Sequence, residues 1–173
     1  MSEPVSAPKR SPQTGVARGI GIGLGLTIAA AILGSYRSSA AVLEARLTTL
    51  GIALLVLGLW MAAAIGDVAR RRFASTAAIG GRDGVDDRVD AANAILRNTA
   101  EQALLASIAY AALTLISDHA RVPVALFAAC FTAGRLLFWS GYRDGAEARA
   151  LGFALTFYPS IAALLMAALA TLR

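Results

Sequence analysis

Long apolar runs separated by short polar connections make up most of the chain. Three of the runs contain no charged residue, and they cover residues 19–36, 47–66 and 150–172. A helix needs roughly 20 residues to cross a hydrocarbon core of about 30 Å, so each of these runs is long enough to do so. The pattern predicts a transmembrane helix in each of them.

Two further runs are apolar but include polar residues. Residues 122–142 contain Arg135, and residues 102–117 are preceded at helical spacing by Asn98 and Glu101. A charged side chain at membrane depth costs about 2.5 to 3.5 kcal/mol on insertion scales, so such residues are as a rule paired or functional. The chain is therefore predicted to be an all-α integral membrane protein with five helices. The polar residues within its apolar runs are the candidates for a functional site.

The polar segments divide the chain into a tail, a first helix and a larger domain. Residues 1–15 are rich in Pro and Ser and lack a periodic pattern, which predicts a disordered cytoplasmic tail. Residues 16–37 are predicted to be an additional N-terminal transmembrane helix, and residues 42–173 a four-helix membrane domain. The longest polar connection inside that domain covers residues 74–92.

The first helix is rich in glycine. Gly19 with Gly23, and Gly21 with Gly25, form small-xxx-small pairs, which allow two membrane helices to approach closely. A cleaved signal peptide is the alternative for this segment, because basic residues precede the apolar run.

Composition agrees with a membrane protein. Hydrophobic residues make up 57% of the chain and charged residues 16%, and the mean hydropathy is +0.63; soluble domains have about 25% charged residues. Cys130 and His119 are the single cysteine and the single histidine, and nothing in their spacing indicates a metal site.

The 16 basic residues predict the orientation of the chain. With five helices and a cytoplasmic N-terminus, twelve of them fall on or toward the cytoplasmic side and four on the other side. Cytoplasmic loops of membrane proteins have an excess of Lys and Arg, so this asymmetry favours that orientation. Because topology accounts for the basic charge, no nucleic-acid partner is predicted. The high usage of Ala, Gly and Arg is typical of a bacterial inner membrane protein.

Polar residues in two helices have spacings that place them together. Asn98 and Glu101 are three residues apart, so they are neighbours on one helical side. Arg135, Tyr142 and Arg149 follow at intervals of seven, and they form one stripe if the helix continues through the link between them.

Two such stripes suggest a cationic pocket with a carboxylate and amides, suited to a small anionic, peptide-like ligand. The alternative is an ion pair of Glu101 with Arg97 or Arg135 that only fixes helix packing.

The same residues belong to two motifs that resemble a known family. The first is LRNTAEQ, and the second is GRLLFWSGYRDGAEAR, which leads into the last helix. Both are similar to the signature regions of the MAPEG superfamily, the membrane-associated proteins of eicosanoid and glutathione metabolism that include microsomal glutathione transferases. The resemblance covers roughly residues 42–173, with the first helix as an addition.

This resemblance implies a homotrimer that binds glutathione between subunits near the cytoplasmic face. It places five residues in the glutathione-binding set: Asn98, Glu101, Gln102, Arg135 and Tyr142. Arg149 matches the arginine that is proposed to stabilise the glutathione thiolate in active members, and a nearby guanidinium does favour the ionised form of a thiol. The implied function is a glutathione-dependent transferase or peroxidase acting on hydrophobic electrophiles.

Three positions depart from the pattern of active members. Ala94, Leu96 and Phe138 stand where many of those members have polar side chains. Each change removes a charge or a hydrogen bond that would hold the tripeptide. The alternative function is therefore a non-catalytic membrane protein on the MAPEG scaffold that binds a lipid or a partner protein.

Overall fold

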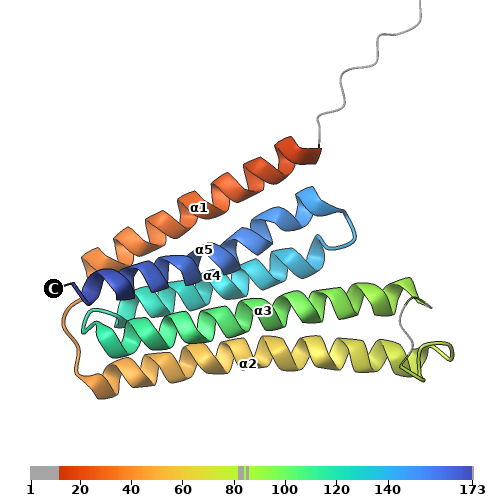
Figure 1. Ribbon diagram of the computed structural model, residues 1–173, viewed down its shortest axis with the longest axis horizontal. Helices are drawn as coiled ribbons and strands as arrows, with labels where there is room; N and C mark the ends of the chain where they lie inside the picture. The colour runs from red at the N-terminus through yellow and green to blue at the C-terminus, as the bar shows by residue number, and fades with distance from the viewer. Residues whose placement is uncertain (1–11, 82–83, 85, 173) are drawn as a thin grey trace, which may run out of the picture.

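The computed structural model describes residues 12–81, 84 and 86–172, and within them the regular structure is helical. The helices are α1 (Pro12–Arg37), α2 (Leu43–Ala74), α3 (Asp87–Ile116), α4 (Arg121–Ser140) and α5 (Ala146–Ala170). All five are long and apolar enough to cross a membrane. Figure 1 shows them side by side with alternating directions. The predicted all-α membrane-spanning fold is confirmed.

The helix ends differ from the predicted ones at two places. α1 begins at Pro12, so residues 12–15 of the predicted tail are its first turn, and the rest of that tail lies outside the described residues. Proline suits this position because its fixed φ matches the helix and its missing N–H has no partner there anyway. α2 extends beyond the uncharged run of residues 47–66 at both ends and covers Leu43–Ala74.

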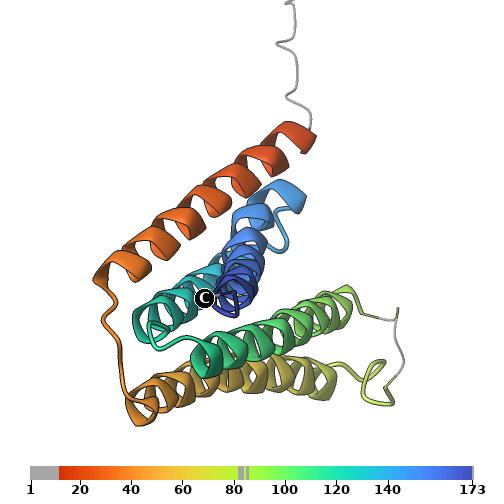
Figure 2. The ribbon, with the colours of Figure 1, turned by 60° about the vertical axis from the view of Figure 1, so that its left-hand side comes forward.

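The helices pack as two pairs with α1 on the outside. α2 packs against α3, α4 packs against α5, and α3–α5 and α2–α4 contacts join the pairs. α1 packs against α5 and α4, and Figure 2 shows it on the side of the bundle opposite α2. The buried centre includes Tyr110 of α3 and Phe127 of α4, whose stacked rings have centroids 6.3 Å apart.

The start of α3 is fixed by an acidic cap. The Asp86 carboxylate accepts a hydrogen bond from the backbone N–H of Arg88 at 2.8 Å. This bond lowers the pKa of Asp86 below its ordinary value, because it stabilises the charged form. α3 therefore begins at a defined residue near the membrane surface.

Small residues hold α1 against α5. A Cβ atom at Gly19 would lie 3.0 Å from the Cβ of Ala150, and one at Gly23 would overlap the side chain of Ala154. A Cβ atom at Gly21 or Gly25 would meet nothing within 4 Å. Of the two predicted glycine pairs, the Gly19–Gly23 pair makes the close contact, because those two residues share the face that meets α5.

Replacing Gly23 with valine is expected to lower the melting temperature of the detergent-purified protein. The new side chain would overlap Ala154, and overpacking of this kind costs about 1 to 3 kcal/mol. Gly25→Val is the matched control, because it adds the same side chain to the open face of the same helix. Equal melting temperatures for the two variants would contradict the observed α1–α5 packing.

Candidate functional site

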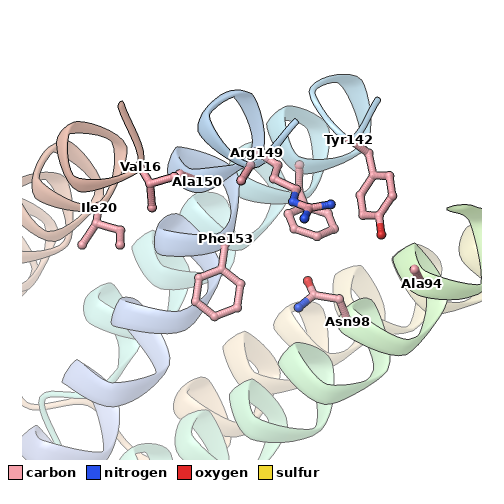
Figure 3. A pocket seen from close by; sticks show the side chains of 10 residues that line it. Val16, Ile20, Ala94, Asn98, Tyr142, Arg149, Ala150 and Phe153 are labelled. Carbon is pink, nitrogen blue, oxygen red and sulfur yellow. The ribbon is translucent and has the colours of Figure 1, made fainter. Parts of the chain in front are cut away.

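A cavity of about 400 Å³ lies where the start of α1, the first half of α3 and the α4–α5 link meet. It is lined by Val16, Ile20, Ala94, Asn98, Phe138, Tyr142, Ala146, Arg149, Ala150 and Phe153. Figure 3 shows the side chains of Asn98, Tyr142 and Arg149 directed toward the same space. These three are among the residues that the sequence predicted to lie together.

The α4–α5 link brings Tyr142 and Arg149 to the cavity. The condition for a single stripe, one helix that continues through this link, is not met: α4 ends at Ser140, α5 begins at Ala146, and α5 runs back along α4 (Figure 1). Gly145 has a φ of 99°, which residues with a side chain rarely adopt, so glycine permits the reversal here. The guanidinium carbon of Arg149 lies 4.6 Å from the centroid of the Tyr142 ring, on its face.

The two helices of this hairpin touch through glycines. A Cβ atom at Gly134 would lie 2.8 Å from the carbonyl oxygen of Gly152. This close approach brings the residue after Gly134, Arg135, within reach of Thr156 on α5. The backbone contact thus places the guanidinium of Arg135, a residue of α4, between α3 and α5.

Arg135 is completely buried behind the cavity, with 0% of its surface exposed. Its guanidinium donates hydrogen bonds to Oδ1 of Asn98 at 2.9 Å and to Oγ1 of Thr156 at 2.8 Å. The guanidinium carbon also lies 4.7 Å from the centroid of the Phe138 ring. Among the described residues Arg135 makes no ion pair with a carboxylate, so neutral oxygens and an aromatic face solvate its charge.

The bond from Arg135 fixes the orientation of the Asn98 amide. Because Oδ1 of Asn98 accepts from the guanidinium, the two N–H donors of that amide remain for other partners. Figure 3 shows the amide in the space between Phe153 and Arg149. The cavity therefore offers an amide donor, a phenol and a guanidinium, a set that suits a carboxylate, a peptide carbonyl or a thiolate.

Glu101 and Gln102 are not part of this cavity. Glu101 is exposed halfway along α3 and makes no ion pair with a described residue, while Gln102 is buried with 5% of its surface exposed. The amide oxygen of Gln102 has no hydrogen-bond partner among the described residues. Their predicted contact with glutathione stays a prediction.

Arg97 and Ala94 border a second, more polar cavity. This cavity has a volume of about 480 Å³ and includes Arg72 and Asp90, and Ala94 lies in the wall of both cavities. Arg97 directly precedes Asn98, so its side chain points about 100° away around the helix. It therefore lines this second cavity and not the first.

The sequence did not predict the apolar residues of the cavity on α1 and α5. Val16, Ile20 and Phe153 line it. One signal was available: Val16 and Ile20 each precede by three residues a glycine, Gly19 or Gly23, that packs on α5. They therefore share a face with the helix contact.

The helices and the cavity together define a class of protein. It is a polytopic helical membrane protein with a cavity at one end of the bundle, where an arginine, a tyrosine and an asparagine meet among apolar side chains. The sequence model of the MAPEG family matches residues 47–169, and the chain belongs to this family. No curated protein and no solved structure matched in the corresponding searches.

Proposed function

We propose that the protein is a membrane-bound glutathione-dependent transferase and peroxidase that acts on hydrophobic electrophiles. Membership of the MAPEG family makes it a membrane protein of the kind that serves glutathione and eicosanoid metabolism. The observation that supports the finer proposal is the meeting of Arg149, Tyr142 and Asn98 at one cavity. Together they offer charge and hydrogen-bond donors to a tripeptide with an ionisable thiol.

The proposed mechanism uses Arg149 to stabilise the thiolate. The thiol of glutathione gives its proton to water, the sulfur forms a bond to the electrophilic carbon, and the leaving group departs with its electron pair. A guanidinium near the sulfur lowers the thiol pKa and so raises the fraction of nucleophile at neutral pH. Asn98 holds the peptide through its amide N–H groups, and Arg135 acts through Asn98 as a positioning residue.

A hydroperoxide is the second acceptor class. The thiolate takes the terminal peroxide oxygen, an alcohol leaves, and a second glutathione converts the sulfenic acid to glutathione disulfide and water. No further reductant is needed. The same cavity can serve both reactions, because both begin with a thiolate.

The exposed Glu101 supports an association of subunits, which we propose is the homotrimer that the resemblance to the family implies. A carboxylate on the outer face of a membrane helix is costly unless another group covers it, and such residues as a rule face the interior of an assembly. Glu101 is halfway along α3 and is exposed in the single chain. A neighbouring subunit on this face would cover Glu101. The side chains of that subunit would also line the second cavity, which includes Ala94 and Arg97.

The distribution of arginines supports a cytoplasmic position for the cavity. At the end of the bundle that holds the cavity lie the start of α1, the end of α2, the start of α3, the end of α4 and the start of α5 (Figure 1). Described arginines at or near these ends are Arg18, Arg70, Arg71, Arg72, Arg88, Arg97, Arg143 and Arg149, against Arg37, Arg46 and Arg121 near the opposite ends. By the positive-inside rule this distribution supports a cytoplasmic position for the cavity and for the start of α1.

Glutathione at 10 mM is expected to raise the melting temperature of the detergent-purified protein by several degrees. A ligand that binds the folded state alone adds about 2.7 kcal/mol at 100 times its Kd, and 1 kcal/mol corresponds to about 2 to 4 °C for a chain of this size. A mixture of glutamate and glycine at the same concentration controls for added ions. An unchanged melting temperature would contradict glutathione binding.

A non-catalytic MAPEG protein is the second candidate. Ala94 and Phe138 line the cavity without offering a polar side chain, so fewer groups are available to hold a tripeptide. If glutathione raises the melting temperature but the protein neither conjugates electrophiles nor reduces hydroperoxides, this candidate is favoured.

A further inference from the structure

We propose that the N-terminal helix α1 forms the acceptor side of the cavity, and that Val16 and Ile20 contact the hydrophobic compound that reacts with glutathione. Both residues line the cavity and both precede residues 47–169, which match the family. The proposal rests on the proposed function. It makes α1 a specificity-determining element of the enzyme as well as a membrane helix.

The cavity has two chemically different sides. Its polar side comes from α3, α5 and the α4–α5 link and comprises Asn98, Tyr142 and Arg149. The other side comes from α1 and α5, and Figure 3 shows Val16 and Ile20 near Ala150, with Phe153 between them and Asn98. A glutathione thiolate beside Arg149 would thus have the polar side, which binds the peptide, on one hand and the apolar side from α1 and α5 on the other.

The position of α1 is set by direct packing. Gly19 and Gly23 allow α1 to approach Ala150 and Ala154 so closely that added Cβ atoms would collide. Ala150 is itself part of the cavity wall. The residues that fix α1 on α5 are therefore neighbours of the residues that form the apolar side.

The chemistry of this side selects an uncharged acceptor. Its four side chains, from Val16, Ile20, Ala150 and Phe153, contain neither a charge nor a hydrogen-bond donor. The Phe153 ring is stacked on the Phe157 ring, with centroids 5.6 Å apart and planes at 17°, which fixes its orientation. A surface of aliphatic groups and one fixed aromatic ring suits an alkyl chain or a flat aromatic compound that dissolves in lipid.

The test uses cysteine protection with two thioethers of glutathione. Ile20→Cys is made in a Cys130→Ala background, so that the new thiol is the single one in the protein. The rate of its modification by N-ethylmaleimide is measured with saturating S-methylglutathione or S-hexylglutathione. Both compounds lack a free thiol, and they differ in the length of the apolar group that extends from the sulfur.

S-hexylglutathione is expected to slow the modification of Ile20→Cys at least tenfold, and S-methylglutathione less than threefold. Ile22→Cys is the matched control, because Ile22 is on the same helix with 44% of its surface exposed. Neither compound should protect it. Should Ile20→Cys fail to fold, Val16→Cys provides the same test.

The outcomes separate this proposal from the proposed function. If S-hexylglutathione raises the melting temperature but does not protect Ile20→Cys, α1 is not the acceptor side, although glutathione binding stands. Equal protection by both thioethers would place Ile20 on the peptide side and also overturn the proposal. If neither thioether raises the melting temperature of the wild-type protein, both proposals fall.

Discussion

Replacing Arg149 with alanine is expected to lower the rate of glutathione conjugation at pH 7 by about 100-fold or more. Arg149 lines the cavity, and its guanidinium is held over the Tyr142 ring at 4.6 Å. A thiol with its ordinary pKa of about 8.5 is only a few per cent ionised at pH 7. Loss of the nearby positive charge therefore lowers the fraction of bound glutathione that is ionised. It also removes a group that stabilises the negative charge of the transition state. The measurement is the steady-state rate with a chlorodinitrobenzene acceptor.

The pH dependence identifies the role of Arg149. In the wild-type protein the rate should level off near the lowered pKa of the bound thiol, below about 8.5, whereas in Arg149→Ala it should continue to rise through about 8.5. The difference between the two proteins must therefore shrink as the pH rises. A loss of equal size at pH 7 and pH 9.5 would show that Arg149 binds glutathione without ionising its thiol.

Arg143→Ala is the matched control for this experiment. Arg143 is an exposed arginine in the same link and is not among the residues that line the cavity. Removing it changes the net charge of the protein by the same amount. Its conjugation rate should stay within about twofold of the wild-type rate, since charges exposed to solvent are strongly screened.

The sequence predicted the helices well because each is long enough to cross a membrane. Runs without charge located α1, α2 and α5, and the polar residues Asn98 and Arg135 marked α3 and α4, two of the helices that build the site. Such runs depend only on local composition, so they do not require knowledge of the packing.

The sequence predicted the meeting of Tyr142 and Arg149 for the wrong reason. A continuous helix would place them two turns apart on one stripe, whereas a hairpin brings them together. The signal for the hairpin was Gly145, whose positive φ ends the link. A glycine in a polar link indicates a reversal, although it does not say which side chains will meet.

Tertiary packing alone decides which faces of α1 and α3 are covered. Glu101 and Asn98 are three residues apart, yet Asn98 lines the cavity and Glu101 is exposed. In a helix with apolar residues on all sides the hydrophobic pattern does not identify the inner face. For the same reason the sequence did not reveal that Val16 and Ile20 reach the cavity.

Replacing Arg135 with methionine is expected to reduce by at least half the rise in melting temperature that glutathione causes. The melting temperature without glutathione should not fall. Arg135 is buried without a carboxylate partner among the described residues, and replacing buried charges with apolar side chains of similar volume is often neutral or stabilising. Few groups would lose their bonds, because the hydroxyls of Thr99 and Thr156 also donate to backbone carbonyls of their own helices. The melting temperature without ligand should be unchanged or higher.

The same substitution should lower the conjugation rate by about 10- to 100-fold, because misplacing a ligand by about 1 Å can cost a factor of that size. Without Arg135 the amide of Asn98 is free to turn, and its N–H donors no longer point reliably into the cavity. The melting shift caused by glutathione should fall by at least half. Arg135→Ala, in contrast, should melt at a lower temperature, because it leaves a void in a packed interior.

A double-mutant cycle tests whether Arg135 acts through Asn98. If it does, Arg135→Met combined with Asn98→Ala should be no slower than Asn98→Ala alone, because the first change has nothing left to disturb. A further tenfold loss in the double variant would show that Arg135 affects glutathione by another route, such as its charge. That result would contradict the positioning role, whatever the melting temperatures, since the hydrogen bond to Oδ1 of Asn98 is the contact on which that role depends.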